Sequence, residues 1–196
     1  NEYKKTLKDS RFPVSDYVDP KEFIETLSDK MKDDGVYVAD VGQNQIWSCA
    51  YHVVKKGKFL TSGGMGTMGY SIPAALGAKL ANPSKQVIAV CGDGSFQMSM
   101  CELATIKQEN ANVKIVVFKN GYLGMVREYQ HYTYNDNYSV VELNDYPNLE
   151  LLAKAYDFDY YKVTLDKELP LIDKFLQSKN PGIMEVMINP KDVVKG

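Results

Sequence analysis

The chain has 196 residues, 44% of them hydrophobic and 24% charged, a mixture that excludes disordered and fibrous proteins and can build one domain with a core. A net charge of −2, with both signs scattered, argues against nucleic acid and anionic lipid as partners. No run approaches the roughly 18 apolar residues of a membrane span, there is no signal peptide, and three cysteines predict no disulfide framework, so we expect a cytoplasmic protein.

The first half of the chain alternates between helical and strand patterns. Residues 1–19 are polar and aperiodic, and we interpret them as an arm or linker before a domain at 20–190, with a tail at 191–196. The domain opens with a helix at 20–32, because Phe23, Leu27 and Met31 recur on one helical face. A strand at 36–41, a helix at 44–54, a short strand around 59–60, a glycine-rich turn and a helix at 71–81 follow.

The second half continues this alternation. We predict strands at 86–91, 113–118, 160–163 and 182–188, and helices at 98–108, 124–132, 148–156 and 167–177. Strands separated by helices indicate a doubly wound α/β fold, with a mainly parallel six-stranded sheet and helices on both faces. Ligands bind beyond the carboxyl ends of such strands, so the loops after Val41, Leu60, Cys91 and Phe118 should carry the chemistry.

The most informative motif is Gly92-Asp93-Gly94-Ser95, which lies between a predicted strand and a helix. Flanking glycines let the backbone approach an anion, and the N–H groups that open a helix favour phosphate. Asn120 follows the next strand, 27 residues after Asp93, so the two side chains should lie close together. Carboxylate, amide and phosphate oxygens suit Mg²⁺. The alternative is structural: Asp93 caps the helix and Asn120 forms a turn.

A second glycine cluster carries a formal G-x-G-x-x-G pattern at Gly64, Gly66 and Gly69. It follows a short predicted strand and precedes a helix, so a nicotinamide dinucleotide site, with Asp93 as its ribose-binding acid, is an alternative. Asp93 has glycine neighbours and Ser95 of its own, which favours a metal-bound diphosphate over a nicotinamide.

Four segments resemble a known family. The stretch from Gly92 to Asn120 resembles the thiamine-diphosphate-binding motif, which begins with GDG and ends in paired asparagines. The large catalytic subunit of acetohydroxyacid (acetolactate) synthase is similar to DVGQNQIW (40–47), TSGGMGTMGYSIPAALGAKLA (61–81), GDGSFQMSMCELATIKQEN (92–110) and LGMVREY (123–129). The resemblance covers only the C-terminal, diphosphate-binding domain, so the N-terminal pyrimidine-binding and middle domains of that enzyme are absent from this chain.

The resemblance implies a role for each site residue. It makes Asp93, the Asn120 side chain and the Tyr122 carbonyl the ligands of Mg²⁺. The residues that would hold the diphosphate are Gln43, Asn44, Gly94 and Ser95, and Gly92 would be a further cofactor-binding residue.

The resemblance also implies which residues contact the reacting part of the cofactor. The backbone at Gly66 and Met68 would bind the pyrimidine, and the Met68 side chain would be the catalytic wedge that bends the cofactor. Met125 would contact the cofactor and line the substrate pocket. Tyr129 would join it there, at a position where the biosynthetic enzymes carry tryptophan.

The activity implied by the resemblance is decarboxylation of pyruvate and condensation of the two-carbon unit with a second 2-oxo acid, in branched-chain amino acid biosynthesis. The resemblance further implies a homodimer or homotetramer and a possible regulatory subunit. It implies FAD only for the full-length enzyme. The activating glutamate belongs to the N-terminal domain, so the isolated chain should be nearly inactive.

Three positions depart from the family pattern. Asn44 and Tyr129 replace residues common in the family, and Lys119 stands where the first paired asparagine is expected. A catabolic acetolactate synthase, or another thiamine-diphosphate-dependent decarboxylase or carboligase, is therefore an alternative. An NAD(P)-binding oxidoreductase domain and a non-catalytic assembly domain are two others.

Overall fold

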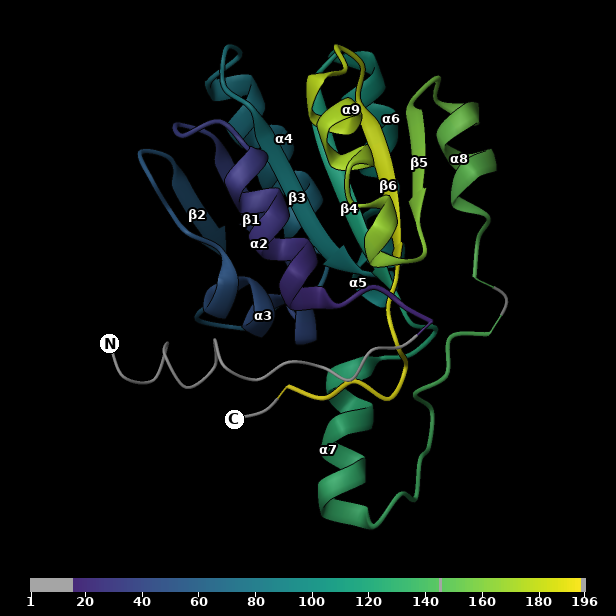
Figure 1. Ribbon diagram of the computed structural model, residues 1–196. Helices are drawn as coiled ribbons and strands as arrows, with labels where there is room; N and C mark the ends of the chain where they lie inside the picture. Colours follow the sequence, from purple (N-terminus) through teal and green to yellow (C-terminus); the bar gives the residue numbers. More distant parts are fainter. Residues whose placement is uncertain (1–15, 145, 195–196) are drawn as a thin grey trace.

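Six parallel strands form the centre of the computed structural model, which describes residues 16–144 and 146–194 (Figure 1). In chain order they are β1 (Val36–Ala39), β2 (Lys58–Thr61), β3 (Val87–Gly92), β4 (Val113–Lys119), β5 (Asp159–Val163) and β6 (Gly182–Met187). Their order in the sheet is β2-β1-β3-β4-β6-β5. The predicted doubly wound α/β fold is confirmed. Most of the arm predicted at 1–19 lies outside the described residues, as does the end of the tail predicted at 191–196.

Helices cover both faces of the sheet, and each face has its own apolar core. One face carries α2 (Pro20–Lys30), α3 (Gln43–Tyr51) and α9 (Leu171–Gln177), and the other α4 (Ser71–Ala81), α5 (Asp93–Ser99), α6 (Glu102–Gln108) and α8 (Leu149–Ala155) (Figure 1). Successive strand residues enter opposite cores: Tyr37 and Ile88 pack on the first face, Val38 and Ala89 on the second. The central strands β1 and β3 are apolar along their length because both of their faces are buried, whereas the edge strands β2 and β5 carry polar residues and are partly exposed.

Three predicted helices have an end that differs from the structure by three or more residues. The helix expected at 167–177 begins only at Leu171, after a separate 3-10 turn at Asp166–Glu168. The single helix expected at 98–108 is two helices, α5 and α6, with a turn at 100–101. α5 begins directly after β3 because the Ser95 hydroxyl accepts the Gly92 N–H at 3.2 Å, which satisfies a backbone donor at the helix start. α3 ends at Tyr51 rather than at 54, because the Val53 N–H donates to the Ser28 hydroxyl on α2 at 2.9 Å.

The winding of the chain reverses between β1 and β3. From β1 the chain crosses to β2 at one edge of the sheet, and it then returns to place β3 on the other side of β1. The loops at the carboxyl ends of β1 and β3 therefore diverge, which leaves a crevice between them. α7 (Gly124–Tyr134) projects beyond this end of the sheet and contains no buried residue (Figure 1). No helix within the described ranges is both long and apolar enough to cross a membrane.

Candidate functional site

A small cavity of about 60 Å³ lies between the loops that follow β1, β3 and β4. Ten of the twelve predicted site residues line it: Gln43, Asn44, Met68, Gly92, Asp93, Gly94, Ser95, Asn120, Tyr122 and Met125. They come together from distant parts of the chain because the carboxyl ends of neighbouring parallel strands meet at one edge of the sheet.

Asp93 is the buried acid of this cavity, with 2% of its surface exposed. One carboxylate oxygen accepts the N–H groups of Gly121 (2.7 Å) and Asn120 (3.2 Å), and the other accepts that of Gly94 (2.9 Å). Burial raises the pKa of Asp93 to about 6, and the backbone hydrogen bonds oppose that rise. Within the described residues no lysine, arginine or histidine forms an ion pair with Asp93, so its charge has no counter-ion there.

The loop between β4 and α7 brings Asn120 beside Asp93. Gly121 adopts a φ of +75°, a left-handed conformation that glycine reaches without strain. Asn120 Oδ1 accepts the Tyr122 N–H at 2.9 Å, which closes the turn. The structure thus places Asp93, Asn120 and Tyr122 around one cavity.

Gln43 and Asn44 open α3 and are buried. Asn44 Nδ2 donates to two backbone carbonyls, that of Asp40 (2.9 Å) and one on β3 (3.2 Å), so it ties the ends of β1 and β3 together. Gln43 Nε2 donates to Glu128 Oε2 on α7 (2.9 Å) and to the Asp192 carbonyl (2.8 Å). Their amide donors are engaged within the protein, so a ligand would have to compete for them.

Asp40 positions the loop at 62–70, which carries Met68. It is fully buried directly after β1, and its carboxylate accepts the N–H groups of Gly69 (2.9 Å) and Ser71 (2.7 Å). Asp40 is not among the predicted site residues. The signal that points to it is a carboxylate at the end of an apolar strand, because such a group is buried only where donors satisfy it.

Two predicted residues do not line the cavity. Gly66, with a φ of +65°, is exposed in the loop at 62–70. Tyr129 on α7 is 59% exposed and packs edge to face on Tyr134, with ring centroids 5.9 Å apart. Met125, in the first turn of the same helix, does line the cavity.

Lys119 stands next to Asn120 but does not line the cavity. Its ammonium lies 3.4 Å from the carboxylate of Glu185, which is buried on β6, and 4.8 Å from the centroid of the Tyr146 ring. The ion pair shows how the fold accommodates a lysine at this position, since the side chain turns to the neighbouring strand.

The donor set around the cavity suits a hard divalent cation. Its lining includes the buried Asp93 carboxylate, which has no counter-ion among the described residues, and the amide-bearing Asn120, and carboxylate and amide oxygens are groups that Mg²⁺ prefers. The glycine pattern at Gly64, Gly66 and Gly69 lies instead in a long loop after β2, which is an edge strand. A dinucleotide fingerprint needs a tight turn after a central strand, so the nicotinamide alternative is not supported.

Comparison with known proteins gives a consistent result. A family model described as "Thiamine pyrophosphate enzyme, C-terminal TPP binding domain" matches residues 40–186. The acetolactate synthase large subunit of Lactococcus lactis subsp. lactis is 39% identical over 183 residues, 93% of this chain and 32% of that protein. The acetolactate synthase of Arthrospira platensis is 43% identical over 160 residues (79% and 27%), and the acetolactate synthase isozyme 2 large subunit of Escherichia coli K12 is 38% identical over 169 (85% and 31%). The chain thus spans about a third or less of the length of these relatives.

Proposed function

The chain belongs to the family of thiamine pyrophosphate enzymes, whose C-terminal TPP-binding domain it contains, and we propose that its cavity holds the diphosphate of thiamine diphosphate through Mg²⁺. The observation that carries the proposal is the buried carboxylate of Asp93, which lies against the Asn120 loop and has no counter-ion in the described part of the chain. A divalent cation would supply the missing positive charge and connect the carboxylate to phosphate oxygens.

We assign the metal ligands to the Asp93 carboxylate, the Asn120 side-chain oxygen and the Tyr122 carbonyl. The residues assigned to the diphosphate are Gln43, Asn44, Gly92, Gly94 and Ser95. The packing at Gly94 supports a close approach of the backbone, because a Cβ there would lie 2.6 Å from Leu123 Cδ2 and 3.4 Å from Met68 Cε. Only glycine fits that position without moving the walls of the cavity.

Met68 is assigned as the apolar wedge against the cofactor, with the backbone of Gly66 and Met68 facing its pyrimidine. Asp40 would fix the wedge, because it holds the N–H groups of Gly69 and Ser71 on the C-terminal side of Met68. The bound cofactor supplies an electron sink for decarboxylation. Met125 and Tyr129 are assigned to the substrate pocket.

The cavity is too small for the whole cofactor. A volume of about 60 Å³ compares with roughly 30 Å³ for one water molecule in the liquid, so it takes part of the diphosphate and leaves the rings outside. The exposed side of α7, which carries Tyr129 and Tyr132, lies beside the same loops. We propose that a second subunit completes the site there, in a homodimer or homotetramer.

For the longer protein we propose acetolactate synthase activity: decarboxylation of pyruvate and transfer of the two-carbon unit to a second 2-oxo acid. The names of the relatives and the identity of 38–43% support this assignment. A regulatory subunit and FAD belong to the same proposal and concern only the longer enzyme.

Calorimetric titration of the chain with thiamine diphosphate, with and without Mg²⁺, tests the proposed site. We expect Mg²⁺-dependent binding by the wild type and by Asp29→Ala, which removes an exposed carboxylate on α2, and loss of binding in Asp93→Ala. Circular dichroism establishes that each variant is folded. Equal binding by Asp93→Ala, or binding indifferent to Mg²⁺, would contradict the proposed metal site.

Product analysis of the longer enzyme tests the activity. Pyruvate alone should give 2-acetolactate, and added 2-oxobutyrate should give 2-aceto-2-hydroxybutyrate. Release of acetaldehyde as the sole product would assign the chain to a simple decarboxylase instead.

A further inference from the structure

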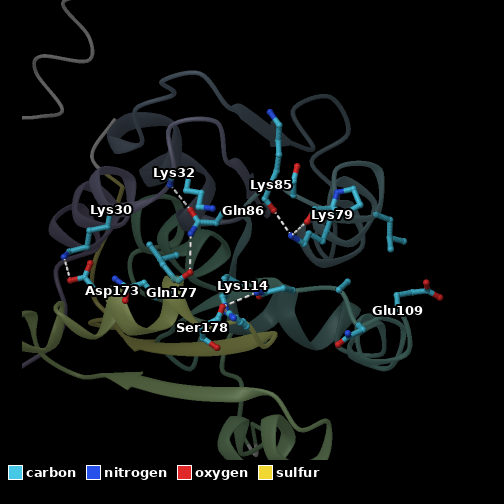
Figure 2. A pocket seen from close by; sticks show the side chains of 18 residues that line it. Lys30, Lys32, Lys79, Lys85, Gln86, Glu109, Lys114, Asp173, Gln177 and Ser178 are labelled. Atoms are coloured by element: carbon cyan, nitrogen blue, oxygen red, sulfur yellow. Dashed lines mark hydrogen bonds and ion pairs between the residues drawn. The ribbon is translucent and has the colours of Figure 1, made fainter.

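A second and larger hollow lies at the opposite end of the sheet from the cavity just described. It has a volume of about 710 Å³, and the segments that form it flank the amino ends of β1, β3, β4 and β6 (Figure 2). This amino-end groove shares no lining residue with the cavity around Asp93. Its volume falls within the roughly 300–1,000 Å³ of small-molecule sites in proteins.

The amino-end groove concentrates positive charge. Its lining contains two carboxylates, Glu109 and Asp173, and six lysines: Lys30, Lys32, Lys79, Lys85, Lys114 and Lys179. That is an excess of four positive charges in one hollow of a chain whose net charge is −2. A concave surface lined by one sign of charge raises the local concentration of oppositely charged ligands.

Two of these lysines donate to backbone carbonyls and form no ion pair in the part of the chain that the structure describes. Lys79 Nζ donates to the carbonyls of Pro83 (2.8 Å) and Lys85 (2.7 Å). Lys114 Nζ donates to those of Ser178 (3.0 Å) and Asn180 (2.5 Å), and its residue is buried. Carbonyl oxygens satisfy the ammonium donors, but they carry no full negative charge that would neutralise them.

The other lysines are only partly neutralised. Lys30 pairs with Asp173 at 2.5 Å, and Lys85 lies 3.9 Å from Asp34. Lys32 and Lys179 are exposed and form no ion pair in the described part of the chain. Both are therefore available to a ligand.

The ammonium groups act on one another across the groove, where Figure 2 shows Lys32, Lys79 and Lys114 around the same hollow. Burial and the charge of Lys32 lower the pKa of Lys79. Burial lowers the pKa of Lys114 to about 8, with Asp159 opposing and Lys79 reinforcing that change. A bound anion would relieve this repulsion, since it would place negative charge between the amines.

We propose that the amino-end groove binds a small multivalent oxyanion, a compound with several phosphate or carboxylate groups. The lysines supply its charge complement, and the amide of Gln177 lines the same hollow as a neutral hydrogen-bonding group. The amides of Gln86 and Asn112 also line it, but they already donate to the Leu176 and Ser178 carbonyls. The net charge of the chain disfavours an extended polyanion such as nucleic acid, because its charge would run beyond the groove onto a surface without excess positive charge.

Titration of the full chain with tripolyphosphate, citrate and acetate tests this proposal. A chelator removes divalent cations, which keeps the proposed metal site out of the measurement, and about 0.15 M salt screens diffuse attraction. The test variant is Lys32→Gln with Lys179→Gln. The matched control is Lys56→Gln with Lys167→Gln, which removes the same charge from two exposed lysines outside the groove.

We expect tripolyphosphate to bind and acetate not to bind, with affinity reduced at least about fivefold by the test variant and unchanged by the control. If citrate also binds, the ligand class is multivalent anions in general. If citrate does not bind and tripolyphosphate does, the ligand class is phosphates. Asp93→Ala should bind tripolyphosphate as tightly as the wild type does. The test of the groove therefore does not depend on whether the proposed cofactor site is correct. Amine acetylation read by mass spectrometry should show protection of Lys32, Lys85 and Lys179 in the wild type, independently of how the variants fold.

Three results would overturn the proposal. They are no binding of either multivalent anion up to ~1 mM, equal weakening by the test and control variants, and protection of lysines elsewhere while those of the groove stay reactive. Binding of an acidic peptide without either small anion would assign the groove to a protein partner instead.

Discussion

Replacing Asp40 by asparagine should destabilise the fold and loosen the loop that carries Met68. The Asp40 carboxylate is fully buried and accepts the N–H groups of Gly69, Ser71 and Val41 at 2.7–2.9 Å. In Asp40→Asn one oxygen becomes an NH₂ group of nearly the same size. The new NH₂ group then lies against a backbone N–H, and because both groups are donors they cannot form a hydrogen bond. At least one charge-assisted hydrogen bond is therefore lost.

The expected cost follows from these contacts. A hydrogen bond to a charged group contributes about 1.5–3 kcal/mol and an unsatisfied buried donor costs about 1–3 kcal/mol, so we expect Asp40→Asn to lower the free energy of unfolding by roughly 2–4 kcal/mol. Asp40→Ala should cost more, because it removes every acceptor. Asp29→Asn, on the exposed side of α2, should change stability by less than about 0.5 kcal/mol.

Urea unfolding measures the stabilities, and hydrogen exchange locates the effect. Exchange of the Gly69 and Ser71 amides should accelerate in Asp40→Asn more than that of the strand amides. A loss below about 1 kcal/mol with unchanged exchange at those two amides would refute the reasoning, because the carboxylate would then not be holding the loop.

Gly124→Ala should weaken Mg²⁺-dependent binding of thiamine diphosphate about tenfold with little change in fold, because the added Cβ would lie 2.1 Å from Gln43 Oε1 and 3.0 Å from Asn120 Nδ2. Gly77→Ala is the control for binding, because nothing lies within 4 Å of a Cβ at that position. The same change lies inside α4, and thermal unfolding should show that it stabilises the fold by ~0.5–1 kcal/mol. Burial lowers the pKa of Lys114 in the folded protein to about 8, from an ordinary value of 10.5. The folded state therefore bears the full cost of burying the charged amine below pH 8, and this cost is relieved as the pH rises towards 10.5. Between pH 7.5 and 10 the free energy of unfolding of the wild type should thus rise by about 1–2 kcal/mol relative to that of Lys114→Met. Urea unfolding at the two pH values checks this, and a constant difference between the proteins would contradict it.

The sequence was most informative where one local pattern was enough. Continuous apolar runs separated by amphipathic segments predicted the parallel sheet, because only strands buried on both faces are apolar throughout. The spacing of Asp93 and Asn120 on successive strands predicted their approach, and the two residues do meet at the ends of β3 and β4. The position of Tyr129 within α7 could not be read in the same way, because exposure depends on what packs against a helix.

The sequence by itself determined the fold class, the family and the set of residues at the carboxyl ends of the central strands. These properties follow from short-range periodicity and from motifs in which each residue serves a fixed local geometry. Only the tertiary structure decided which buried groups support the site, since the bonds from Asp40 to Gly69 and Ser71 cross 29 and 31 residues of chain. It also decided that lysines scattered from position 30 to 179 gather in one groove, because parallel strands place their amino ends together however far apart they lie in the chain.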